Sequence, residues 1–206
     1  MSDKLGTRQH HILKLLLENK SGLTIDALAS ELAISRNAVQ QHITVLERDG
    51  YIQSGGLSKT AGRPVRCYQL TAAGINCFPK QYAWFAELVL SHLKQELTPE
   101  SLEQYLHTLG HSVAEQLASQ FNDKNTEQRV QALLAVMNQL GFSADVNSDG
   151  QTTEIRAHNC IYHDLAQKHP EICELDKSLI KALTQRAVEH KACMAKGDND
   201  CVFKLS

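Results

Sequence analysis

The sequence lacks the features that would place it among membrane, exported or catalytic proteins. None of its apolar runs approaches the roughly 20 residues that a bilayer-spanning helix needs. The first residues, MSDKLGTRQHH, have no apolar core of the kind found in a signal peptide. There is also no nucleophile paired with a base, no glycine-rich phosphate loop and no HExxH motif. We therefore expect a cytoplasmic protein that has no membrane partner and is not an enzyme.

Cysteine pairs of the CxxC type, typical of zinc ribbons, are missing as well, although the chain has six cysteines. Thiols stay reduced in the cytoplasm, so clustered cysteines there favour a metal, an iron–sulfur cluster or redox chemistry over structural disulfides. A chain of 206 residues allows one large or two small domains, each able to bury a core.

Neither sign of charge dominates, but the charge is unevenly spread. Residues 1–80 hold ten Lys/Arg and six Asp/Glu, a net charge of +4, and the whole chain carries −2, so residues 81–206 carry −6. A basic first part and an acidic second part suit a DNA-contacting module joined to a regulatory one.

Three helical segments are predicted between residues 8 and 50. Thr24 can cap the second helix and Ser35 the third, and the turn between these two helices is short. The buried stripe of the third helix consists of Val39, Ile43 and Leu46. Its polar face consists of Arg36, Asn37, Gln40, Gln41 and His42. A tight turn before a polar-faced third helix is typical of a helix-turn-helix.

Residues 51–70 predict a β-hairpin wing behind the third helix. A strand begins at Tyr51, residues 53–65 are rich in glycine, and residues 66–70 alternate as a return strand. Lys59, Arg63 and Arg66 lie where a wing would meet phosphates or an adjacent minor groove.

Two stretches, SRNAVQQHITVLERDGYI and GRPVRCYQLTAAG, resemble the winged helix-turn-helix of bacterial repressors of the ArsR/MarR/DeoR kind, over about residues 8–75. The partner is then a double-stranded DNA operator, because Arg, Asn and Gln side chains match base edges in a major groove. The predicted DNA contacts are Ser35, Arg36, Asn37, Gln40, Gln41, His42, Lys59, Arg63 and Arg66. The alternative is an amphipathic third helix with a solvated face.

The rest of the chain is expected to form a second domain. Pro79 marks the boundary, so we predict a winged helix-turn-helix over 1–76, a connector over 77–81 and a sensing domain over 82–206. Residues 82–96 are strongly apolar at helical spacing, and helices follow at about 99–121 and 126–140. We expect these central helices to make a homodimer interface, with an intrachain core as the alternative. A hairpin over 142–157 and a tail of helices and strands make the fold class α+β.

Four cysteines gather in the tail, at Cys160, Cys173, Cys193 and Cys201. We predict a helix from about residue 159 to 168 and another over 171–190, with Cys193 in a short strand. Helix N-termini would then lower the pKa of Cys160 and Cys173 and favour the thiolates that bind soft metals. The same domain offers four histidines as further ligands, at His158, His163, His169 and His190.

The tail resembles the SufR family, iron–sulfur-dependent repressors of cluster-assembly genes. The residues that carry the resemblance are Asn159-Cys160, the run HPEICE at 169–174, and Gly197-Asp198 leading to Cys201-Val202-Phe203. It implies a [4Fe–4S] cluster on Cys160, Cys173 and Cys201 that sets the affinity for operator DNA. Cys193 is a fourth ligand, a spare thiol or a residue that acts on oxidation.

Other sensors fit the same cysteines. The tail could bind zinc, or it could respond to oxidants through a disulfide with no metal at all. Its end, from Cys193 through Gly197 to Phe203, also resembles small-molecule-binding domains of the 4-vinyl reductase type, which would make the signal an organic ligand.

Overall fold

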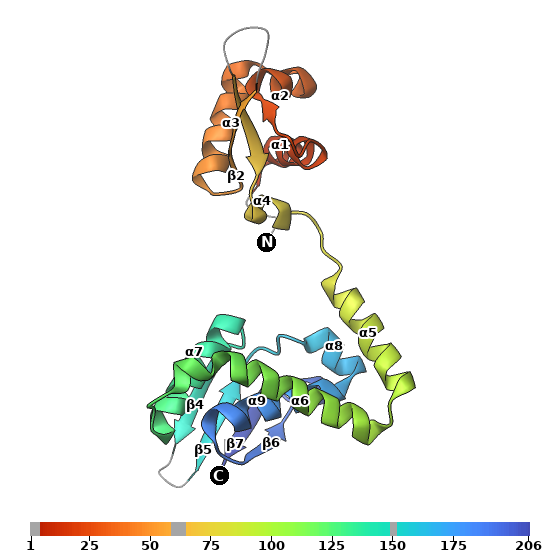
Figure 1. Ribbon diagram of the computed structural model, residues 1–206, viewed down its shortest axis with the longest axis vertical. Helices are drawn as coiled ribbons and strands as arrows, with labels where there is room; N and C mark the ends of the chain where they lie inside the picture. Colours follow the sequence, from red (N-terminus) through yellow and green to blue (C-terminus); the bar gives the residue numbers. More distant parts are fainter. Residues whose placement is uncertain (1–4, 59–64, 149–151) are drawn as a thin grey trace. The chain divides into compact units, whose positions relative to one another are not determined.

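The computed structural model describes residues 5–58, 65–148 and 152–206. The chain divides into two compact units, residues 1–81 and 82–206 (Figure 1). In the part of the chain that the structure describes, no helix is both long enough and apolar enough to span a membrane. The fold is α+β, with a winged helix-turn-helix in the first unit and a mixed helix and sheet region in the second.

Three helices form the body of the first unit: α1 (Thr7–Glu18), α2 (Ile25–Leu32) and α3 (Arg36–Arg48). The predicted caps are confirmed. The Thr24 hydroxyl accepts the N–H of Ala27 at 3.1 Å, and the Ser35 hydroxyl accepts the N–H of Ala38 at 3.2 Å. Each satisfies a backbone donor that the first turn of a helix would otherwise leave unpaired.

A three-stranded antiparallel sheet completes this unit, with β1 (Leu23–Thr24), β2 (Ile52–Ser58) and β3 (Val65–Leu70) in the order β1-β3-β2. The strands β2 and β3 are those of the predicted wing. The short helix α4 (Ala72–Asn76) follows, capped by Thr71. The buried core consists of Ile12, Leu13, Leu16, Leu28, Leu32, Val39, Ile43, Leu46, Ile52 and Tyr68.

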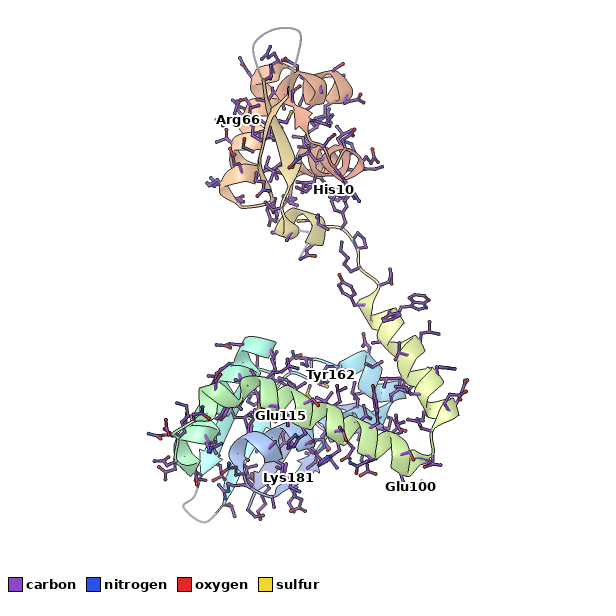
Figure 2. The ribbon with its side chains drawn as sticks, viewed as in Figure 1. His10, Arg66, Glu100, Glu115, Tyr162 and Lys181 are labelled. Atoms are coloured by element: carbon purple, nitrogen blue, oxygen red, sulfur yellow. The ribbon has the colours of Figure 1, made fainter. Side chains whose placement is uncertain are left out.

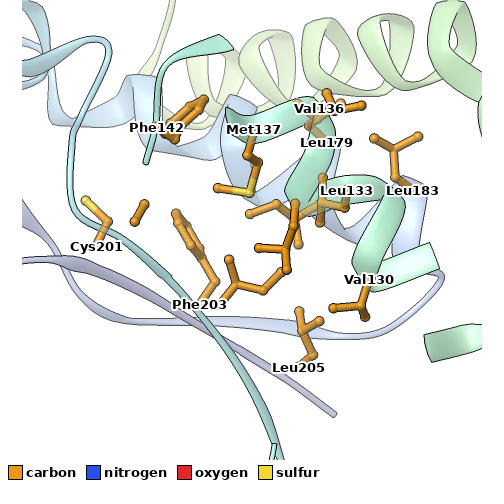
Figure 3. Close-up of a cluster of buried hydrophobic side chains, with 14 of the residues drawn as sticks. Val130, Leu133, Val136, Met137, Phe142, Leu179, Leu183, Cys201, Phe203 and Leu205 are labelled. Atoms are coloured by element: carbon orange, nitrogen blue, oxygen red, sulfur yellow. The ribbon is translucent and has the colours of Figure 1, made fainter. Parts of the chain in front are cut away.

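The second unit is built on a four-stranded antiparallel sheet of order β4-β5-β7-β6. Its strands are β4 (Ala144–Ser148), β5 (Thr153–Ala157), β6 (Val188–Ala192) and β7 (Cys201–Leu205). The helices α7 (Thr126–Leu140) and α9 (Cys173–Thr184) pack on the sheet (Figures 1 and 3). The core between them includes Val130, Leu133, Met137, Ile155, Leu179, Leu183, Phe203 and Leu205.

Helix α6 (Pro99–Leu117) packs against α9 at close range. A Cβ atom on Gly110 would lie 2.4 Å from the carbonyl oxygen of Leu175, so only glycine fits there without a shift of backbone. The hydroxyl of Ser178 donates to the carbonyl of His107 at 2.7 Å and joins the same two helices. The 3₁₀ turn η1 (Ala118–Phe121) then leads to α7.

Helix α5 (Tyr82–Glu96) begins the unit, and each of its residues is at least partly exposed. Two short elements lie beside it: α8 (His163–Lys168) and the 3₁₀ turn η2 (Pro170–Ile172), which leads into α9. Between β6 and β7 the chain makes a further 3₁₀ turn, η3 (Met194–Lys196).

Two predicted helix limits are wrong. The helix expected from residue 159 begins only at His163, because Asn159 is tied to the end of α7: its N–H donates to Phe142 and its side-chain amide donates to Gly141. The helix expected over 171–190 ends at Thr184. Gln185 takes a left-handed conformation with φ of 57°, and the following residues pair as β6 with β7 instead.

Candidate functional site

The polar face of α3 is presented to solvent. Arg36, Asn37, Gln40 and Gln41 are exposed, whereas His42 is half-buried. On the opposite side Val39, Ile43 and Leu46 are completely buried in the core of the unit. The apolar side of α3 is therefore fixed in the core of the unit, and its hydrogen-bonding side chains lie on the other side. Reading base edges in a major groove requires this arrangement.

Two of the predicted contact residues have another role in the free protein. The guanidinium of Arg36 makes an ion pair with Asp26 at 2.8 Å, so it would exchange that carboxylate for a phosphate or a base edge. The hydroxyl of Ser35 is occupied as the cap of α3. Arg66 is exposed and projects from β3 (Figure 2). The predicted wing contacts Lys59 and Arg63 lie outside the described residues.

The four tail cysteines are brought to one end of the second sheet. Cys160 follows the end of β5, Cys193 follows the end of β6, and Cys201 begins β7. Ala157 pairs with Cys201 and Ala192 pairs with Val202, so these three strand ends meet. Cys173 enters from the first turn of α9. The antiparallel register therefore gathers residues that are far apart in the sequence.

Cys160 and Cys201 form one pair of thiols. The hydrogen bond from the Cys201 side chain lowers the pKa of Cys160 to about 6, and the same bond, with burial, raises the pKa of Cys201. The backbone N–H of Met194 also donates to the sulfur of Cys201 at 3.4 Å. The Cys160 thiolate is thus stabilised by Cys201, and the sulfur of Cys201 already accepts a backbone N–H.

Cys173, Cys193 and His190 form a second group. One ligand atom of each lies within 4.8 Å of the others. Burial, followed by the neighbouring Cys193, raises the pKa of Cys173 to about 12 in the metal-free protein. The expectation that the N-terminus of α9 favours a thiolate at Cys173 is therefore wrong here, because burial outweighs the helix dipole.

The ring of His190 is fixed by its surroundings. It stacks on Phe203 with ring centroids 4.6 Å apart and planes 13° from parallel. Its Nε2 is buried and has no hydrogen-bond partner among the described residues. Burial, with the charges of Lys177 and Lys196, lowers the pKa of His190 and so favours the neutral imidazole. A neutral ring with an open nitrogen is the form that binds metals.

The other three histidines are engaged elsewhere. His158 bonds to Asp145 and Asp200, both at 2.7 Å. His169 lies 3.4 Å from the hydroxyl of Ser91, and the ring of His163 bonds to the next turn of its own helix, at Gln167. Sequence spacing gave no reason to choose among the four. His190 stands out only because its strand ends at the cysteines.

Two further residues, Asp176 and Tyr162, border the cysteines and were not among the predicted site residues. Asp176 lies one turn after Cys173 and is only 8% exposed, and burial together with Cys160 raises its pKa to about 7. Burial and the nearby Asp176 raise the pKa of Tyr162 to about 12. Apart from their position near predicted cysteines, nothing in the sequence marks them. The charge of a Cys160 thiolate contributes to both shifts, so it favours the protonated form of each neighbour.

The segment between Cys193 and Cys201 is a tight loop. The N–H of Cys193 donates to the Asp198 carboxylate at 2.7 Å, and its carbonyl accepts the N–H groups of Lys196 and Asp198. Gly197 turns the chain with φ of 101°, a conformation that favours glycine. The loop sets both sulfurs at the same end of the sheet. Thiolate and imidazole are the ligands that zinc, copper(I) and iron–sulfur centres take, so the donor set fits a soft metal centre.

Comparisons with known proteins assign both units. Residues 8–54 match the family model described as HTH domain, and residues 83–206 match the model described as Methanogen output domain 1. No curated protein is similar enough to be counted as a relative.

Several solved structures are similar over part of the chain. A mutant form of S. aureus MepR is 24% identical, over 57% of this chain and 81% of that one, with a TM-score of 0.34. Lactococcus lactis ZitR in complex with DNA is 31% identical, over 48% and 66%, with a TM-score of 0.31. Streptococcus pneumoniae FabT in complex with DNA is 19% identical, over 48% and 66%, with a TM-score of 0.33.

The match to Methanogen output domain 1 covers more than half of the chain. The match to the HTH domain covers α2, α3 with its polar face, and all but the first residue of α1. The chain belongs to the Methanogen output domain 1 family and is a DNA-binding transcriptional regulator of the winged-helix type.

Proposed function

We propose that this regulator is a cytoplasmic, homodimeric repressor of iron–sulfur cluster assembly genes, of the SufR type. Its affinity for a double-stranded operator would depend on a [4Fe–4S] cluster held by Cys160, Cys173 and Cys201, with Cys193 as the fourth thiolate. The observation that carries this proposal is the convergence of four cysteines at one end of a sheet, from four separate segments. Four thiolates are the usual ligand set of such a cluster.

The bound cluster would link the β5 end, the start of α9 and the β6–β7 loop. The segment between Cys160 and Cys173 contains α8 and η2, and these elements lie against α5. Lys168 pairs with Glu87 at 2.7 Å, Lys94 pairs with Glu171 at 2.6 Å, and His169 meets Ser91. A change in the position of Cys160 or Cys173 would therefore move the supports of α5.

Helix α5 is also the element best suited to pair two copies of the chain. Ala86 and Leu90 are half-buried within the unit, while Tyr82, Trp84, Phe85, Leu88 and Val89 are 40–71% exposed. The most apolar face of the helix thus points away from the rest of the second unit. An exposed apolar surface of this kind marks an interaction site, and dimers of winged-helix proteins read paired half-sites.

These contacts suggest a mechanism. Because α5 follows the connector from the first unit, a shift of α5 at a dimer interface would change the separation of the two α3 helices. Operator half-sites have a fixed spacing, so a small change in separation would weaken several contacts at once.

The test begins with anaerobic purification of the full chain. We expect a brown protein that contains iron and acid-labile sulfide and loses both in Cys160→Ser, Cys173→Ser and Cys201→Ser. Cys77→Ser, in the first unit, is the matched control and should keep the colour. A DNA duplex selected from random sequence is then used to compare loaded and cluster-free protein. Equal affinity of the two forms for DNA would contradict the proposal. A colourless protein that contains only zinc would also contradict it and would indicate a zinc-binding regulator instead.

A further inference from the structure

The end of the sheet carries more ligands than one centre needs. Four thiols and the His190 ring make five soft donors, whereas a [4Fe–4S] cluster and a tetrahedral ion each take four. Three of the five, Cys173, Cys193 and His190, are already close to one another, with ligand atoms within 4.8 Å.

The spacing of this group fits a single ion. With zinc–sulfur bonds of about 2.3 Å and zinc–nitrogen bonds of about 2.0 Å, ligand atoms around a tetrahedral ion lie roughly 3.5–3.8 Å apart. A shift of about 1 Å at the side chains would thus be sufficient to close the group on an ion. Hydrogen bonds of the loop hold the backbone of Cys193, so this adjustment would come from rotation of the side chains.

The position of His190 gives an independent indication of a ligand. Its Nε2 is buried, yet within the described chain no donor or acceptor meets it. A buried polar atom left unpaired loses its bonds to water without replacement, and native proteins rarely accept this unless a water, an ion or a function compensates. The stacking on Phe203 favours this orientation of the ring.

The charges match as well. Two thiolates and a neutral imidazole balance a divalent cation and leave one coordination position for a further ligand. The sulfur of Cys201 accepts the N–H of Met194, the residue after Cys193, so the thiol pair Cys160–Cys201 borders the group and is the source of thiolate nearest along the chain for that position. Cys₂His with a further thiolate is a ligand set that structural zinc sites use.

We propose that Cys173, Cys193 and His190 bind a single divalent ion of the zinc class, with the fourth ligand from the pair Cys160–Cys201. This site is distinct in its ligands from the all-thiolate centre and would hold an ion when no cluster is bound. The proposal deepens the sensor function above and rests on the same cysteine cluster. His190 is the residue that separates the two, since only the single-ion site uses it.

The experiment titrates the reduced, metal-free full chain with Co²⁺ under anaerobic conditions, followed by competition with Zn²⁺. We expect one equivalent of Co²⁺ to bind, with thiolate-to-cobalt charge-transfer absorption and the visible bands of a tetrahedral ion. Cys173→Ser and Cys193→Ser should lose most of the charge-transfer absorption. His190→Ala should bind Co²⁺ at least about tenfold more weakly, equivalent to ~1.4 kcal/mol. His111→Ala, an exposed histidine on α6, is the matched control and should bind as the wild type does.

Two results would overturn the proposal. One is a His190→Ala variant with unchanged affinity and spectrum, and the other is wild-type protein that binds no stoichiometric Co²⁺. Circular dichroism of each variant checks that the fold is intact, and His190→Gln, which keeps a polar side chain of similar length, provides a second variant. Iron–sulfur reconstitution of the same proteins keeps the two proposals apart, because His190→Ala should still accept a cluster and Cys160→Ser should not.

Discussion

Replacing Leu88 by alanine should weaken the proposed homodimer and leave the protomer folded. Leu88 lies on the outer face of α5 and is 52% exposed in the protomer. Full burial of a leucine side chain contributes about 1.5–3 kcal/mol, so burying the exposed half at an interface contributes ~1 kcal/mol. A two-fold interface buries the residue twice, which gives about 2 kcal/mol and a roughly 30-fold higher dissociation constant.

Sedimentation velocity over a dilution series measures this constant. Leu140→Ala is a closely matched control, because Leu140 is also on a helix of the second unit and is 50% exposed. The single tryptophan of the chain, Trp84, is 61% exposed on α5, so its emission should shift to the blue as the dimer forms.

The reasoning is refuted if Leu88→Ala and Leu140→Ala change the dissociation constant equally, or if neither changes it. It is also refuted if Trp84 emission is independent of concentration while the protein dimerises, because α5 would then remain outside the interface. Urea unfolding of both variants should match that of the wild-type protomer within about 0.5 kcal/mol, since both substitutions are at exposed positions.

Three further predictions concern stability and DNA binding. Gly110→Ala should lower the free energy of unfolding by about 1–2 kcal/mol in urea titrations, because overpacking against the Leu175 carbonyl outweighs the helix propensity that alanine adds; a rise in stability would contradict this. Asp176 keeps its proton in the folded, metal-free protein up to a pKa of about 7, whereas the unfolded chain releases it near pH 4, so wild-type stability should fall between these values as pH rises. Asp176→Asn should remove that fall, and identical urea midpoints of the two proteins at pH 5 and pH 8 would be the contrary result. On a selected operator duplex, Asn37→Ala should weaken binding at least about tenfold and relax the sequence preference. Arg66→Ala should mainly reduce the salt dependence of binding, by about one counterion. If Asn37→Ala weakened binding to matched and scrambled duplexes equally, base contact by Asn37 would be contradicted.

The first unit was largely readable from the sequence. The caps Thr24 and Ser35 and the stripe Val39, Ile43 and Leu46 are local signals, and local hydrogen bonds and helical periodicity determine the elements that they predict. The polar face of α3 follows directly, because burying one side of a helix leaves the other side exposed. What the sequence did not contain was the two-residue strand β1, which exists only because β3 lies beside it.

The second unit shows where such reasoning ends. Composition and spacing gathered four cysteines and four histidines in the tail, and only the resemblance to the SufR family singled out Cys160, Cys173 and Cys201. Neither could rank the histidines or decide the role of Cys193. The tertiary structure shows which of these residues lie close together, because the antiparallel register of β5, β7 and β6 brings three strand ends to the same place. The raised pKa of Cys173 likewise results from burial by residues distant in sequence.

The apolar residues of α5 also show the difference between what the sequence predicts and what tertiary packing decides. Their helical spacing was plain in the sequence, but spacing gives only which residues share a face, not whether that face meets its own core or the solvent. Here the side that packs on the second unit carries Ala86 and Leu90, and Trp84 and Phe85 are exposed. The sequence by itself determined the helices and wing of the first unit and which side chains carry thiols, imidazoles and base-reading groups. Only tertiary packing decided which donors meet and which apolar surface remains uncovered, because both depend on contacts between segments that are remote along the chain.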